Sequence, residues 1–126
     1  MYRNAQLAYD QGSKVTGSVR EQEAAALFKA ARMLEACKKE WDHPDRRTRF
    51  SEALQANLRL WTFFQVQLSR PDSELPADLR RDLLRLSTFV DRRTIEAMAH
   101  PAAERLQALI DINRHVAQGL ANKPAA

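Results

Sequence analysis

The sequence predicts an all-α protein, folded as a small antiparallel bundle of four to five helices. Apolar residues recur with the helical period of about 3.6 residues along almost the whole chain. Three glycines and few clusters of β-branched residues leave little material for strands or hairpins. With 126 residues, the chain has the length of one domain with one hydrophobic core. We therefore expect a single domain over residues 1–126.

The N-terminal part predicts a loosely ordered arm followed by a long helix. Gly12 and Gly17 are expected to break the helical pattern, so residues 1–17 form the arm. Ser18 stands three residues before Glu21, as in a capping box, where the hydroxyl and the carboxylate satisfy free amides of the first turn. The helix is expected to continue to the end of an apolar stripe that consists of Leu27, Ala30, Ala31, Leu34, Cys37 and Trp41.

The next two helices are predicted to be joined by a loop that contains two prolines. Asp42-His43-Pro44 interrupts the helical pattern, and a second helix should start near Asp45. Pro71 and Pro76 lack amide donors and disfavour helical backbone in the residues before them, which predicts a loop over 69–76. The main apolar face of the second helix is Phe50, Leu54, Leu58, Trp61, Phe64 and Leu68, and that of the third is Leu79, Leu83, Leu86, Val90 and Ala97.

Both of these helices carry further apolar residues outside the main face. They are Leu60, Phe63 and Val66 on the second helix and Leu84, Phe89 and Ile95 on the third. A helix that is apolar on two faces is either central in its bundle or half covered by a partner. Aromatic anchors are common in interfaces, which makes Phe63 and Trp61 the first candidates for a partner contact. Trp61 belongs to the main face, so a core position is favoured there, whereas Phe63 fits the core and a partner contact equally.

His100-Pro101 ends the third helical pattern and opens the last one. Its apolar stripe consists of Ala102, Leu106, Leu109, Ile112, Val116 and Leu120. Asn113 lies inside this stripe, where a polar amide needs a hydrogen-bond partner. It is therefore expected either to bond to a neighbouring helix or to mark the edge of a partner-binding surface. Gly119 weakens the final turn, and residues 121–126 are expected to fray.

Residue patterns typical of catalysis or ligand binding do not occur in the sequence. His43, His100 and His115 have no Cys or carboxylate at metal-ligand spacing, and the chain contains no GxGxxG, P-loop, GxSxG or HExxH motif. Cys37 is the single cysteine and fits a small buried hydrophobe. We expect no enzymatic activity, metal, cofactor or small-molecule substrate. No apolar run approaches the roughly 20 residues of a membrane span, and the N-terminus lacks a secretion signal, so we expect a cytoplasmic protein without membrane contact.

Several motifs together resemble the FlaF family of flagellar biosynthesis regulators. They are Leu60-Trp61-Thr62-Phe63, the loop at 71–76, Leu79-Arg80, Val90-Asp91-Arg92, Leu109-Ile110-Asp111-Ile112-Asn113 and Gly119-Leu120, and the resemblance extends over nearly the whole chain. It implies a small cytoplasmic protein that binds flagellin and supports its synthesis and secretion. The resemblance also implies that the protein works opposite the translational repressor FlbT.

The resemblance and the two-sided helices together favour a flagellin-binding chaperone and post-transcriptional regulator. Flagellin polymerises through long amphipathic terminal helices, and a groove on a helical bundle can cover the apolar stripe of such a helix. The candidate partner-binding residues are Leu60, Phe63, Val66, Leu84, Phe89, Ile95, Trp61 and Asn113.

Two alternatives stay open. The first is a translational regulator that binds a flagellin transcript through Arg46, Arg47, Arg49, Arg80, Arg81 and Arg92, as a net charge of +4 and a pI near 9.6 allow. Direct RNA binding is less favoured, because each basic run has an acidic residue within two positions. The second is a homo-oligomeric helical scaffold whose two-sided helices pair with one another.

Overall fold

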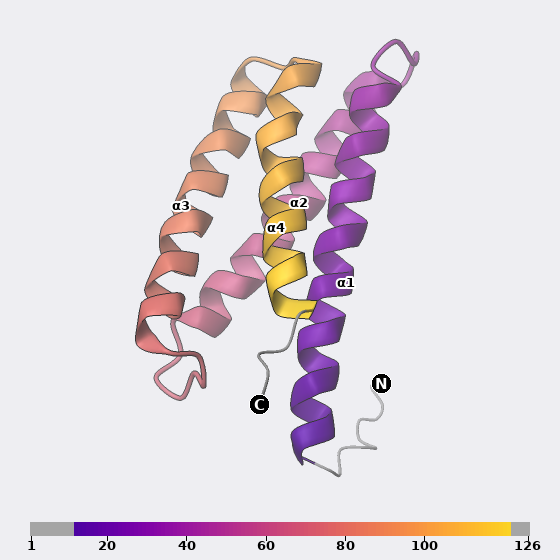
Figure 1. Ribbon diagram of the computed structural model, residues 1–126. Coiled ribbons are helices and arrows are strands. Elements are labelled where there is room, and N and C mark those ends of the chain that lie inside the picture. The colour runs from indigo at the N-terminus through magenta and orange to yellow at the C-terminus, as the bar shows by residue number, and fades with distance from the viewer. Residues whose placement is uncertain (1–11, 122–126) are drawn as a thin grey trace.

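The computed structural model describes residues 12–121, with side chains from Val19 onward, and confirms the all-α prediction. The elements are α1 (Gly12–Lys39), α2 (Arg46–Leu68), α3 (Ala77–Ala99), the short 3₁₀ helix η2 (Ala103–Leu106) and α4 (Gln107–Ala121). Successive α-helices run in alternate directions and are joined by short connections (Figure 1). The expectations for residues 1–11 and 122–126 lie outside the described residues.

The first helix begins earlier than predicted. We expected a break at Gly17 and a start at Ser18, but α1 runs without interruption from Gly12. One glycine in a helix costs only about 1 kcal/mol relative to alanine. Extending an existing helix also costs less than nucleating a new one. The helix ends at Lys39, two residues before the predicted Trp41.

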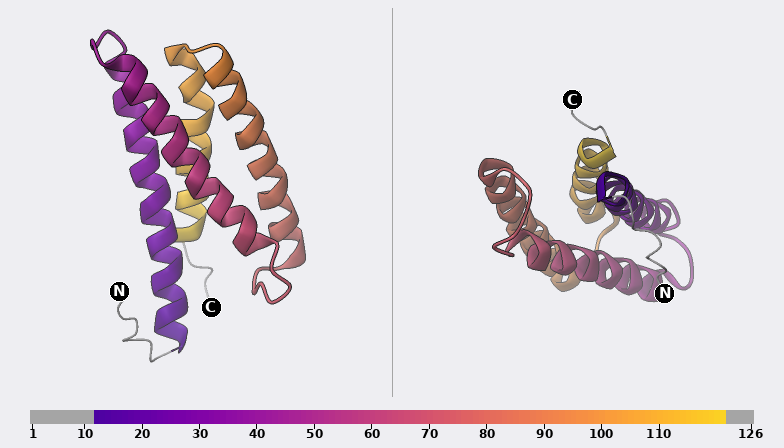
Figure 2. Two further views of the ribbon diagram at one scale, coloured as in Figure 1. Left: turned by 180° about the vertical axis from the view of Figure 1, so that it is seen from behind. Right: turned by 90° about the horizontal axis from the view of Figure 1, so that it is seen from below.

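The helix α1 packs most extensively against α4, and small side chains explain this close pairing. Ala24, Ala30 and Ala31 lie along the buried stripe of α1, and Ala117 is fully buried on α4. Small residues at a helix contact allow the two axes to approach closely. Figure 2 shows α1 and α4 on one side of the bundle and α2 with α3 on the other.

The helix α2 runs diagonally across the bundle, from the end of α1 to the start of α3 (Figure 2). Its buried side chains include Leu54, Trp61 and Phe64 from the predicted main face. The helix ends at Leu68 and α3 starts at Ala77, so the predicted loop over 69–76 is confirmed. Local proline chemistry sets these limits, because it acts through residues adjacent in sequence.

The predicted core position of Leu79 is wrong, since this side chain is 43% exposed. The Gln65 amide donates a hydrogen bond to Asp91 Oδ2 (2.9 Å), which sets the register between α2 and α3. Leu79 precedes Asp91 by twelve residues, whereas α2 continues for only three residues after Gln65. The first turns of α3 therefore extend past the end of α2, and Leu79 finds no neighbour there on that helix.

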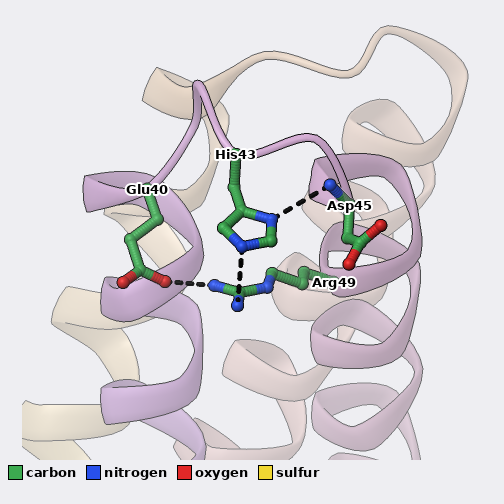
Figure 3. A network of polar contacts seen from close by, with 4 residues as sticks. All are labelled: Glu40, His43, Asp45 and Arg49. Carbon is green, nitrogen blue, oxygen red and sulfur yellow. Dashed lines mark hydrogen bonds and ion pairs between the residues drawn. The ribbon is translucent and has the colours of Figure 1, made fainter.

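The turn between α1 and α2 is held by a small polar network (Figure 3). Arg49 forms an ion pair with Glu40, and the Asp45 backbone N–H donates to His43 Nδ1 (3.0 Å). A second contact joins Arg49 Nη2 to His43 Nε2 (3.2 Å). A neutral imidazole has one acceptor nitrogen, so only one of the two His43 contacts is a hydrogen bond at a given moment. The network links the end of α1 to the first turns of α2.

The Cys37 thiol is buried beside this turn, as predicted for a small hydrophobe. Burial raises its pKa, while the positive charge of Arg49 lowers it and the negative charge of Glu40 raises it further. The thiolate is the reactive form of cysteine, so the raised pKa and the burial both make this thiol less reactive.

Among the helices of the described region, none is long and apolar enough to cross a membrane.

Candidate partner-binding surfaces

Three of the residues predicted to contact a partner are strongly exposed. Phe63 and Val66 on α2 are 51% and 58% exposed, and Ile95 on α3 is 67% exposed. Phe63 and Val66 are three residues apart, which places them on the same side of their helix. Together with three exposed arginines of the same two helices, they form a surface that we call the α2/α3 outer face. It consists of Arg59, Phe63, Val66, Arg85, Arg92 and Ile95.

The hydrogen bond between Gln65 and Asp91 shows which edges of α2 and α3 meet. At about 100° per residue, Val66 is turned away from the core relative to Gln65. By the same measure, Ile95 is turned away from the core relative to Asp91. Val66 and Ile95 therefore lie on the same solvent side of the contact between α2 and α3.

Three other predicted residues do not join this surface. Leu60 and Leu84 are half-buried and pack against the core. Phe89 is 37% exposed, and its ring lies under the Arg93 guanidinium, 4.9 Å from the ring centroid. Phe89 and Ile95 are six residues apart, so they lie on different flanks of α3. The structure therefore does not bring the six apolar residues outside the main faces into one continuous groove.

The two remaining candidates, Trp61 and Asn113, lie inside the core, where each is at most 1% exposed. Trp61 Nε1 donates to Asn113 Oδ1 (2.9 Å), and Asn113 Nδ2 donates to Asn57 Oδ1 (2.6 Å). We call these three residues the polar core. The prediction that Asn113 bonds to a neighbouring helix is confirmed. Trp61 and Asn113 connect α2 to α4, and Trp61 also lines the pocket at the end of the bundle.

Asn57, the third member of the polar core, was not among the residues predicted from the sequence. Asn57 is fully buried, and within residues 12–121 its Nδ2 atom has no hydrogen-bond partner. It stands four residues before Trp61, so both side chains lie on the same side of α2. A polar amide on the main apolar stripe was the available signal, the same signal that identified Asn113.

A pocket of about 420 Å³ opens at the end of the bundle where α1 starts and α4 ends. Apolar side chains from α2, the loop, α3 and α4 form much of its wall, and charged side chains from α1 and the loop complete it. The apolar group includes Phe64, Leu68, Leu75, Leu83, Val116 and Leu120, and the charged group is Arg20, Glu23, Arg70, Asp72 and Glu74. The charged side chains of the pocket are thus of both signs.

Burial raises the pKa of Glu23 at this pocket, and the nearby Arg20 charge lowers it in part. The folded protein therefore binds this proton more tightly than the unfolded chain does. The stability that Glu23 contributes is therefore fully present below pH 4.5, the ordinary pKa of this carboxyl. It is lost as the pH rises through the raised pKa of the folded state.

We predict that Glu23→Gln raises the free energy of unfolding at pH 7 relative to wild type. The neutral amide avoids the desolvation of a half-buried carboxylate. Below pH 4.5 the wild-type carboxyl is protonated in both states, so the two proteins should differ less. Urea unfolding of both proteins at pH 4 and pH 7 measures the difference. A loss of stability in the variant that is larger at pH 7 would contradict the prediction.

Within the described residues, no group of three or more His, Cys, Asp or Glu side chains is arranged to hold a metal ion.

Comparison with known proteins gives one result that covers most of the chain. The model of a family described as Flagellar protein FlaF matches residues 5–120. In the same comparisons, neither a curated protein nor a solved structure matches. Trp61 and Asn113, which belong to two of the motifs that resemble this family, are hydrogen-bonded to each other in the polar core. The chain belongs to the FlaF family of flagellar proteins, and its role lies in flagellar biosynthesis.

Proposed function

We propose that this protein is a cytoplasmic flagellin-binding chaperone and post-transcriptional regulator that supports the synthesis and secretion of flagellin. In this proposal it works opposite the translational repressor FlbT. Membership of the FlaF family supports the flagellar part of the proposal.

The observation that carries the chaperone proposal is the distribution of exposed apolar side chains. Of the eight large hydrophobic side chains that are exposed in the described region, six lie on α2 and α3. They are Phe63, Val66, Leu79, Phe89, Ile95 and Met98. Three of them, Phe63, Val66 and Ile95, belong to the α2/α3 outer face, and exposed apolar area gathered on one face is a typical sign of an interaction surface.

The physical need for such a surface follows from how a filament subunit polymerises. The apolar stripe of an amphipathic helix aggregates or pairs prematurely if it remains in water. A second protein can cover that stripe and release it later, with apolar anchors spaced by three or four residues along the helix. A surface on α2 and α3 leaves the buried core of this protein intact during such binding.

Co-purification with flagellin tests the proposal. We expect full-length flagellin to be retained by the protein, and flagellin without its terminal helices to be lost. The retained fraction is measured by gel densitometry at equal input of both flagellins. The proposal fails if neither flagellin is retained, and equal retention of both would exclude the terminal helices as the bound segment.

A further inference from the structure

Three arginines of the α2/α3 outer face have no acidic partner within the described residues. Arg59 lies on α2, and Arg85 and Arg92 lie on α3; all three are exposed. None of them takes part in an ion pair or a hydrogen bond among residues 12–121. Their positive charges are therefore available to a ligand.

Several acidic groups of α3 are engaged elsewhere, whereas the exposed Asp82 stands three residues before Arg85 and offsets part of its charge. Asp78 pairs with Arg81 (3.0 Å), and Glu96 pairs with Arg93 (3.5 Å). Asp91 accepts the hydrogen bond from Gln65 in the contact between α2 and α3. On α2, the exposed Glu52 stands seven residues before Arg59, about two helical turns away. The part of the face around Arg59 and Arg92 is therefore basic.

The three arginines are spaced so that they flank the exposed apolar residues. Arg59 precedes Phe63 by four residues and Val66 by seven, so all three lie on one stripe of α2. On α3, Arg92 precedes Ile95 by three residues, and Arg85 lies two turns before Arg92. On both helices of the surface, basic side chains therefore precede the exposed apolar ones.

This combination of basic and mostly aliphatic side chains suits an amphipathic helix better than a nucleic acid. Strands of RNA are bound by cations together with aromatic rings on which bases stack. Two of the three exposed apolar residues, Val66 and Ile95, are aliphatic and offer no such platform. The pocket at the end of the bundle is a weaker candidate for a charged partner, because its charged residues are of both signs.

We propose that the α2/α3 outer face binds one amphipathic helix that has acidic residues on both sides of its apolar stripe. The apolar anchors of this helix contact Phe63, Val66 and Ile95. Its carboxylates pair with Arg59, Arg85 and Arg92, which selects acidic over basic helices. The protein that supplies this helix is inferred from the proposed function: the helix is a terminal helix of flagellin.

Two designed peptides test the charge selection. Both are helices of about 20 residues with the same leucine stripe, and they differ in having glutamate or lysine on the flanks. Fluorescence anisotropy with labelled peptides measures the two affinities. We expect the glutamate peptide to bind at least about tenfold more tightly, since each surface ion pair contributes up to about fivefold. Its affinity should fall with added salt, because salt screens exposed charges. Equal affinities would overturn the proposal.

Reversing the charge at two arginine positions tests where the peptide binds. Arg59→Glu combined with Arg92→Glu should weaken the glutamate peptide by at least about tenfold and favour the lysine peptide. The matched control is Lys29→Glu combined with Arg32→Glu, which makes the same change of charge at exposed positions of α1. Circular dichroism verifies that both double variants are folded. Equal weakening in both would show a general charge effect and overturn the proposal.

Flagellin co-purification with the arginine variants distinguishes failure of this inference from failure of the proposed function. If wild-type protein retains flagellin and the Arg59→Glu/Arg92→Glu variant retains it equally well, the inference fails and the proposed function stands. If no flagellin is retained but the peptide preference depends on the two arginines, the surface stands and the proposed function fails. Binding of single-stranded RNA through these arginines, without binding of the glutamate peptide, would assign the surface to nucleic acid. A dimer that buries the face and excludes the peptide would assign it to a second copy of the chain.

Discussion

Leu54→Asp is expected to unfold the protein, whereas Phe63→Asp leaves the bundle folded. Leu54 is fully buried on the core face of α2, and Phe63, on the same helix, is 51% exposed. The aspartate at position 54 loses the packing of a leucine, about 2–5 kcal/mol, and carries a charge into an apolar site without a partner. The sum approaches the whole stability of a small domain, about 5–15 kcal/mol.

Circular dichroism and urea unfolding measure both variants. Phe63 contributes one internal ring contact, with Phe64 at a centroid distance of 6.0 Å, so Phe63→Asp should cost about 1 kcal/mol. Leu54→Ala is the graded control, because it removes the packing without adding a charge and should cost about 2–5 kcal/mol. Equal loss of helix in Leu54→Asp and Phe63→Asp would show that Phe63 belongs to the core.

The contrast between these positions shows how far helical periodicity can place residues. Periodicity assigns Leu54 and Trp61 to the core face of α2, and the structure agrees. It leaves Phe63 undecided, because a second apolar side is covered or exposed according to where the neighbouring helices lie. The diagonal course of α2 decides this point, and it depends on packing among the four α-helices of the described region.

Other errors of prediction have the same cause. The loop over 69–76 is correctly predicted because the effect of a proline is local. Leu79 is wrongly placed in the core because the register between α2 and α3 depends on a contact between Gln65 and Asp91, 26 residues apart. The early start of α1 is missed because the cost of a glycine is small and its surroundings decide the outcome.

The polar core could be predicted only in part. Asn113 stands out as an amide on an apolar stripe, and the expectation of a bond to another helix is correct. Neither its donor Trp61 nor its acceptor Asn57 could be identified, because they are 52 and 56 residues away in the chain. A buried amide reveals that it needs a partner, and only the fold reveals which residue supplies it.

Asn113→Leu is expected to destabilise the protein by about 2–6 kcal/mol. The side chains are similar in size, so the main effect is the loss of both hydrogen bonds of the amide. The indole N–H of Trp61 and the side-chain oxygen of Asn57 remain buried without partners, and each costs about 1–3 kcal/mol. Thr94→Val is the control, since that hydroxyl bonds only to the Val90 carbonyl of its own helix, and it should cost less than about 1 kcal/mol.

The sharper test is the double-mutant cycle with Asn57→Leu. Asn57→Leu alone leaves one buried donor of Asn113 unpaired but also removes the unpartnered Nδ2 of Asn57, so it should cost less than Asn113→Leu. In the double variant only the Trp61 N–H lacks a partner. The double variant should therefore be more stable than Asn113→Leu alone, a non-additivity that only coupled residues produce. Urea unfolding of the four proteins measures the cycle. Additive losses would show that the two amides act independently and that the polar core does not connect α2 to α4 as a unit.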